Sequence, residues 1–207
     1  RDFGNHYYID RIIPVTHGAT CAFLDENEQL VQPVQDYESA VPAHYARAYR
    51  RIRPDFNETQ SPHLPRGLNL GCQIYWHAER DPVRFARVRW ILSYPQYWVW
   101  RLSGALCNEV TSMGCHTDLW SPLKGGFSSL AVGHHWSERF PTLHSAWERV
   151  ATLRSDVARA AQLPPSTRVC VGLHDSNAAL ASILVDPSTQ AKAPALLSTG
   201  TWYIAMA

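Results

Sequence analysis

A short apolar run near the end of the chain constrains the fold more than any other feature. Arg168 to Leu173 is rich in valine and typical of a buried strand, and Asn177 to Val185 has the pattern of a helix. His174 and Asp175 lie between the two. Because ligands of α/β proteins bind at the carboxyl ends of their strands, we expect Asp175 to lie where a substrate could reach it.

Asp175 has two interpretations at that position. A carboxylate there can accept the proton of a substrate hydroxyl as the hydroxyl attacks phosphorus, which accelerates a reaction roughly 10²–10⁴-fold. Equally, the side chain can cap the following helix by accepting a hydrogen bond from the backbone amide of Asn177 or Ala178. The local sequence leaves both roles open.

Three further segments carry groups that could bind a ligand. Ser198-Thr199-Gly200-Thr201 lies between two expected strands, 195–199 and 202–206, and could hold phosphate with its amides and hydroxyls or form a plain hairpin turn. His17 and Gly18 also separate two expected strands, where they could contact a polyol or serve the fold alone. The carboxylates of Asp36 and Glu38 could bind hydroxyls or lie in a solvated loop.

The middle of the chain is expected to be mainly helical, with a loop over 55–66. The sequence predicts helices, from capping residues and breakers, over 41–52, 68–79, 82–90, 93–104, 108–117 and 155–162. Ser93 to Gln96 has the S-x-x-Q form of a capping box, and Gly104 is expected to end the helix that it opens. A third extended stretch is expected over 30–34. Glu109 and Thr111 open one of these helices, where they could face a ligand or only cap it.

Composition excludes several classes of function. The 19 basic and 18 acidic residues give a net charge of +1, so no nucleic-acid surface is expected. No apolar run reaches the roughly 18 residues of a membrane span. The five cysteines form no C-x-x-C pair and the ten histidines no H-x-x-x-H pair, so buried free thiols in a reducing cytoplasm are expected and a metal site is not.

Taken in order, several short motifs resemble the FGGY carbohydrate kinase family over nearly the whole chain. They are Val15–Thr20 with Leu24-Asp25, Leu102–Gly104 with Glu109–Met113 and Leu119-Trp120, Gly172–Asp175, and Ser198–Trp202. The resemblance implies an α/β, actin-like (RNase H-like) ATPase fold with a mixed sheet and flanking helices, incomplete at both ends. Residues 1–190 would form the sugar-binding domain without its first hairpin, and 195–207 the first strands of the ATP-binding domain.

The same resemblance implies a function and assigns roles. Asp175 would be the catalytic base; His17, Gly18, Asp36 and His174 would lie at the sugar; and Ser198, Thr199, Gly200 and Thr201 would contact the phosphates of ATP. ATP and Mg²⁺ are implied as cofactors and a ketose of the deoxyhexulose or pentulose type as substrate, nearest to rhamnulokinase and fuculokinase. The enzyme is expected to be cytoplasmic, and a homodimer is compatible with the resemblance. The fragment alone would be inactive.

Two alternatives stay open. A non-catalytic sugar-binding relative or an actin-like ATPase with another role would share the fold without the activity. An HD-type phosphohydrolase would instead use His174 and Asp175 as a metal-binding pair, but that fold places the pair on a helix, whereas the preceding valine-rich run favours a strand.

Overall fold

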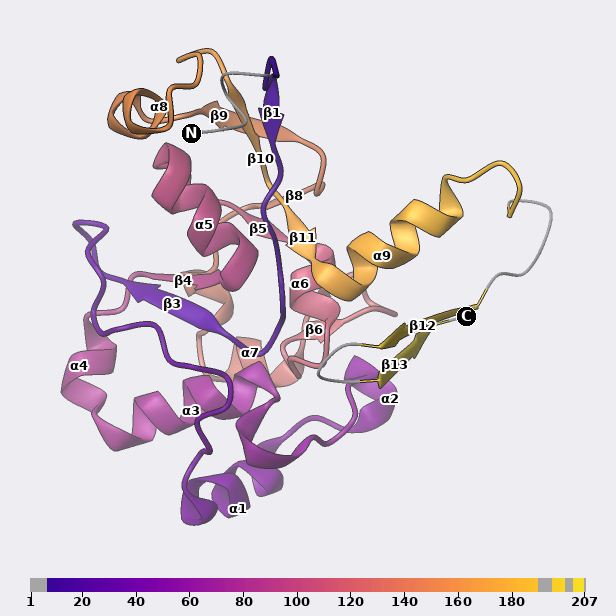
Figure 1. The fold of residues 1–207 in the computed structure, drawn as a ribbon. Coiled ribbons are helices and arrows are strands. Elements are labelled where there is room, and N and C mark those ends of the chain that lie inside the picture. Colours follow the sequence, from indigo (N-terminus) through magenta and orange to yellow (C-terminus); the bar gives the residue numbers. More distant parts are fainter. Residues whose placement is uncertain (1–6, 190–194, 200–202, 207) are drawn as a thin grey trace.

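The computed structural model describes residues 7–189, 195–199 and 203–206. Figure 1 shows a body of helices and short strands, from which helix α9 projects beside the hairpin β12–β13. No helix among the described residues is long and apolar enough to cross a membrane. The five cysteines are free thiols, as expected, and four of them are buried.

The strands are short and form small sheets of both parallel and antiparallel type. Three make one sheet in the order β1 (Arg11–Ile12), β10 (Arg168–Cys170) and β9 (Arg149–Thr152). The remaining strands pair as β2 (Val15–Thr16) with β11 (Leu173–His174), β3 (Cys21–Leu24) with β4 (Trp90–Ser93), β5 (Asn108–Glu109) with β8 (Leu143–His144), β6 (Trp120–Ser121) with β7 (Gly126–Phe127), and β12 (Leu196–Thr199) with β13 (Tyr203–Met206). The β1–β10, β2–β11 and β5–β8 pairs are parallel.

Helices fill the space around these strands. They are α1 (Ala43–Ile52), α2 (Phe56–Thr59), α3 (Leu70–Arg80), α4 (Pro82–Ala86), α5 (Tyr94–Ser103), α6 (Val110–Gly114), α7 (Ser129–Gly133), α8 (Ser155–Ala161) and α9 (Asp175–Leu184), with 3₁₀ turns η1 (Pro65–Gly67) and η2 (Ser137–Arg139). Most predicted helices are confirmed to within a few residues. Gly104 ends α5 in the left-handed conformation, as its position predicted.

Several local predictions were wrong. Trp90 ends no helix but begins β4, because Ile91 and Leu92 are buried in an antiparallel pairing with β3. The 30–34 stretch contributes only an isolated bridge from Leu30 to Leu24. The 55–66 loop contains α2, which Asp55 caps through the amide of Asn57. The helix predicted from Asn108 starts later, since Asn108–Glu109 is strand β5.

The sequence S-x-x-Q at the start of α5 does not form a capping box. The side chain of Ser93 makes no bond to the helix backbone and instead donates its hydroxyl to Oε1 of Gln96. The amide of Gln96, which is fully buried, then donates to the carbonyl of Val171 at 2.9 Å. This side chain therefore ties α5 to the segment that joins β10 to β11.

Two hydrophobic clusters hold the body together. The larger lies among α1, α3, β3 and β4 and includes Phe23, Tyr49, Ile74 and Ile91. The smaller packs α5 and α8 against β10 and includes Val169 and Val171. The valine-rich run predicted as one buried strand is indeed buried, but it divides at Gly172 into β10 and β11, which belong to different sheets.

Candidate active site at the ends of two parallel strands

A parallel pairing brings the amino-terminal and carboxyl-terminal candidate residues together. Strand β11 pairs with β2, with Leu173 opposite Val15 and His174 opposite Thr16. Both strands end at these positions. The residues that follow, His17 and Gly18 on one side and Asp175 on the other, therefore leave the sheet at the same edge, where ligands of α/β folds bind.

Asp175 is the first residue of α9 and does not cap the helix as one interpretation predicted. Its Oδ1 accepts a hydrogen bond from the backbone amide of Ser176 at 2.6 Å, and neither Asn177 nor Ala178 donates to it among the described residues. The side chain is 51% exposed. Its Oδ2 takes part in no described hydrogen bond, so a carboxylate oxygen remains available to a substrate.

His174 lies beneath Asp175 and is buried. Its Nε2 lies 3.4 Å from Sγ of Cys115 and 3.4 Å from Oδ1 of Asp175, and its backbone amide reaches Oγ1 of Thr111 at 3.5 Å. Burial lowers the pKa of His174 to about 4 despite the nearby Asp175 carboxylate, so the imidazole is neutral at pH 7. A neutral ring there can both donate and accept a hydrogen bond.

The predicted His17 segment lies between aromatic rings. The imidazole of His17 packs against the rings of Tyr37 and Tyr94 at centroid distances of 4.6 and 4.9 Å. Tyr37 follows Asp36, so this contact also places the Asp36 segment near His17. Asp36 uses one carboxylate oxygen to accept from the amide of Glu38 at 2.9 Å, a local turn contact.

Glu109 caps α6, which settles its role in favour of capping. Its buried carboxylate accepts hydrogen bonds from the backbone amides of Thr111 and Ser112 at 2.8 and 3.0 Å and from both of their hydroxyls. These contacts engage both oxygens. Glu109 therefore holds the start of α6 and positions Thr111 beside His174.

The predicted phosphate loop is described only in part. Ser198 and Thr199 end β12, which pairs with β13 and lies against α9, and Thr199 is exposed. Gly200 and Thr201 lie outside the described residues. The hairpin is confirmed, whereas contact with a phosphate stays a prediction.

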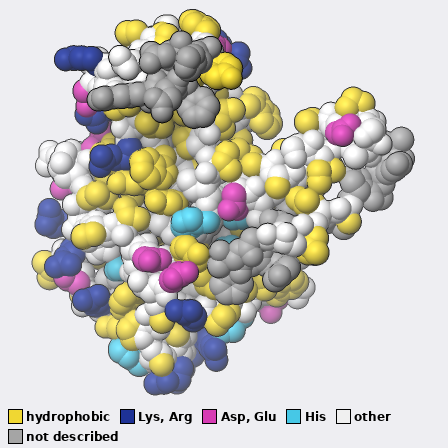
Figure 2. Space-filling view, viewed as in Figure 1, with side chains coloured by type: hydrophobic (Ala, Val, Ile, Leu, Met, Phe, Trp, Pro, Cys, Tyr) yellow, Lys and Arg dark blue, Asp and Glu magenta, His cyan; other side chains and the backbone are white. Residues whose placement is uncertain are grey.

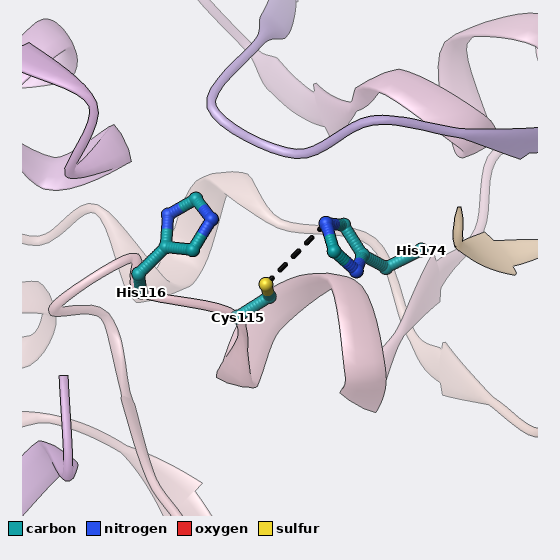
Figure 3. A group of neighbouring side chains, drawn as sticks. All are labelled: Cys115, His116 and His174. Atoms are coloured by element: carbon teal, nitrogen blue, oxygen red, sulfur yellow. Dashed lines mark hydrogen bonds between the residues drawn. The ribbon is translucent and has the colours of Figure 1, made fainter. Parts of the chain in front are cut away.

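Two residues beside Asp175 were not singled out in the sequence. Cys115 and His116 follow α6, and each offers a ligand atom within 4.8 Å of the other and of one from His174 (Figure 3). Burial raises the pKa of Cys115 to about 12 and lowers that of His116. On the face of the molecule seen in Figure 2, histidine side chains lie near the centre and acidic side chains lie on either side of them. No H-x-x-x-H or C-x-x-C motif in the sequence predicts this group, because its members come from two segments that are far apart in the chain.

The HD-type alternative does not fit this arrangement. It requires His174 and Asp175 on one helix, but His174 ends strand β11 and only Asp175 begins α9.

Comparison with solved structures finds a close likeness to sugar kinases. A carbohydrate kinase from Novosphingobium aromaticivorans is 40% identical, with a TM-score of 0.91 over 99% of this chain and 44% of that chain. A xylulose kinase and a gluconate kinase from Lactobacillus acidophilus are each 13% identical over 85% of this chain and 37% of theirs, with TM-scores of 0.73 and 0.74. Neither a family model nor a curated protein sequence matches.

The chain thus spans less than half the length of these three structures. Over the shared part, the predicted α/β fold with strands of both directions and flanking helices is confirmed. The chain has the actin-like ATPase fold of the sugar kinases to which it is similar.

Proposed function

We propose that the protein is an ATP-dependent sugar kinase of the FGGY type, which transfers the γ-phosphoryl group of MgATP to a hydroxyl of a ketose. One observation carries the proposal. Asp175, with a free carboxylate oxygen, shares a sheet edge with His17 and Gly18, on a chain that is 40% identical over 99% of its length to a carbohydrate kinase.

Asp175 is the proposed base. As the sugar hydroxyl attacks the γ-phosphorus, its oxygen forms the new bond to phosphorus and its proton passes to the carboxylate of Asp175, while the bond from phosphorus to ADP breaks. Such transfers depend mainly on positioning and on charge stabilisation. The position of Asp175 at the start of α9, its hydrogen bond from the amide of Ser176 and the buried His174 next to it support such positioning.

His17, Gly18, Asp36 and His174 are the proposed sugar-binding residues. The rings of Tyr37 and Tyr94 beside His17 support this role, because an aromatic face can pack against the apolar face of a sugar while imidazole nitrogens bond its hydroxyls. Gly18 has no side chain to occupy the space beside His174.

Ser198, Thr199, Gly200 and Thr201 are the proposed contacts to the phosphates of MgATP, which is a substrate here. The division into a sugar-binding domain over 1–190 and the start of an ATP-binding domain at 195–207 belongs to the same proposal. A cytoplasmic location and a homodimer are also part of this proposal. A ketose of the deoxyhexulose or pentulose type is proposed because the His-Asp and Gly-Thr-Trp motifs resemble those of rhamnulokinase and fuculokinase.

ATP consumption by the full-length protein, measured against a panel of deoxyhexuloses, pentuloses, gluconate and glycerol, tests the proposal. We expect ADP release that requires one of the ketoses and is stoichiometric with a sugar phosphate. ADP release that does not depend on any sugar would indicate an ATPase with another role. Sugar binding without ADP release would indicate a non-catalytic relative.

A further inference from the structure

Three side chains with metal-binding atoms meet beside Asp175. We propose that Cys115, His116 and His174 bind one divalent ion of the zinc class. Their ligand atoms all lie within 4.8 Å of one another, and Figure 3 shows the thiol and both rings facing a common space. The proposed phosphoryl transfer gives no role to Cys115 or His116.

The separation of two of these atoms matches that of two ligands on one zinc ion. Sγ of Cys115 lies 3.4 Å from Nε2 of His174. Zn–S and Zn–N bonds of about 2.3 and 2.0–2.1 Å at a tetrahedral angle place sulfur and nitrogen roughly 3.5 Å apart. These two side chains could therefore bind an ion with little movement, and only the imidazole of His116 has to approach.

Gly18 lies beside both rings and brings no side chain into the space next to them. A β-carbon on Gly18 would lie 3.1 Å from Nε2 of His174 and 3.4 Å from Cε1 of His116, closer than most such contacts in proteins. The φ of Gly18 is not positive, so a left-handed backbone does not explain why this residue is a glycine. The missing side chain leaves open the space that both rings border.

Both histidines also have the outer contacts that metal-binding histidines make. Nδ1 of His116 lies 3.3 Å from the carbonyl oxygen of Leu68, and donation of its proton there leaves Nε2 as a free ligand. Nδ1 of His174 lies 3.4 Å from the side-chain amide of Asn177, whose oxygen can accept its proton once the amide is turned. His116 is held at φ 43°, a conformation uncommon for residues other than glycine and frequent at functional sites.

The donor set selects the class of ion. One sulfur and two imidazole nitrogens favour Zn²⁺ and its analogues Co²⁺ and Cd²⁺ over Mg²⁺, which prefers oxygen ligands. The site is therefore distinct from the Mg²⁺ of MgATP. On binding, Cys115 gives its proton to solvent as sulfur bonds the ion.

Asp175 lies outside this group of three but is a candidate for the fourth position. Its Oδ1 lies 3.4 Å from Nε2 of His174, again a separation suited to two ligands of one ion. An ion held there would occupy the carboxylate proposed as the base. This consequence, which rests on the proposed function, is inhibition of phosphoryl transfer by zinc.

Titration of the protein with Co²⁺, without ATP or sugar, tests the binding directly. We expect one equivalent to produce a thiolate-to-cobalt charge-transfer band and intense visible bands of tetrahedral cobalt, both removed by one equivalent of Zn²⁺. Cys115→Ser should abolish the charge-transfer band. His116→Asn, which tolerates the positive φ, should weaken binding by more than the roughly 10–100-fold that loss of an outer contact costs.

Two further comparisons sharpen the test. Gly18→Ala removes no ligand but fills the open space, so it should weaken Co²⁺ binding, whereas Cys72→Ala and His135→Ala, which lie outside the group, should not. Absence of the charge-transfer band in the unmodified protein, or its survival in Cys115→Ser, would overturn the proposal. Because binding is read without turnover, Co²⁺ binding by a protein that phosphorylates no sugar would support the metal site and count only against the kinase function.

Discussion

His174 and Thr16 lie opposite each other in the parallel pairing of β11 with β2. This pairing places Asp175 beside His17 and Gly18, although the two segments are far apart in the sequence. The connection just before β11 supports it: the amide of Gly172 donates to the carbonyl of Ala146 at 3.0 Å, and that of Leu173 to the carbonyl of Pro14 at 3.0 Å.

Gly172 is expected to tolerate no side chain. It has φ +76°, and an added β-carbon would lie 2.2 Å from the carbonyl oxygen of Pro14. Gly172→Ala should lower the free energy of unfolding by about 2–4 kcal/mol, from backbone strain together with overpacking. Gly125→Ala is the matched control, because Gly125 has φ +61° but nothing within 4 Å. Urea denaturation measures both, and equal losses would show that the contact with Pro14 is not the cause.

Arg53 and Asp118 form a buried ion pair that anchors the segment after α1. Nε and Nη2 of Arg53 donate to the two carboxylate oxygens at 3.0 and 2.8 Å, and the hydroxyl of Tyr49 donates at 2.8 Å. The side chain of Asp118 is 0% exposed. Arg53→Ala would leave this charge without its cation, at a cost of about 3–5 kcal/mol in unfolding free energy.

Arg84→Ala provides the control for that variant. Its ion pair with Asp81 is largely exposed, at 54% and 40%, and should contribute less than about 1 kcal/mol. Denaturant unfolding of both variants checks the difference. A loss below about 1 kcal/mol for Arg53→Ala would contradict the importance of the buried pair.

His77 should make stability depend on pH. Burial, with smaller effects of Arg80 and Arg84, lowers its pKa from 6.5 to about 4. Between these values the unfolded chain binds a proton that the folded protein does not, so stability is full above about pH 6.5 and falls as the pH is lowered towards 4. For this group alone, the free energy of unfolding should drop by about 2 kcal/mol from pH 7 to pH 5.

His77→Gln removes that contribution. Unfolding measured at pH 7 and at pH 5 should show a smaller difference between the two in the variant, while the change at pH 7 reports the lost packing and the altered contact with Gln32. An unchanged difference would show that His77 titrates alike in the folded and unfolded chain.

Local patterns predicted most of the helices and the burial of the valine-rich run before Asp175, because periodicity and capping residues act over a few positions. They failed at Trp90, where pairing with Leu24 of β3 determines the structure. They failed again at Ser93, whose hydroxyl donates a hydrogen bond to the side chain of Gln96 and does not cap the helix backbone. Each error arose where a contact distant in sequence outweighed the local preference.

The candidate site was predicted in the same uneven way. Asp175, His17 and Gly18 could be proposed from strand ends and from family resemblance, and the β2–β11 pairing brings them to one edge. The group of Cys115, His116 and His174 could not be predicted. Cys115 and His116 lie far from His174 in the sequence, so no short motif contains all three residues. Such a meeting depends on the packing of α6 against β11.

Replacement of Asp175 by asparagine tests the central claim most directly. Asp175→Asn keeps the size of the side chain but cannot accept the hydroxyl proton. In the full-length protein, the rate of sugar-dependent ADP release should fall roughly 10²–10⁴-fold, with sugar binding, measured by calorimetry, largely unchanged. Turnover at the normal rate by Asp175→Asn would show that Asp175 is not the base.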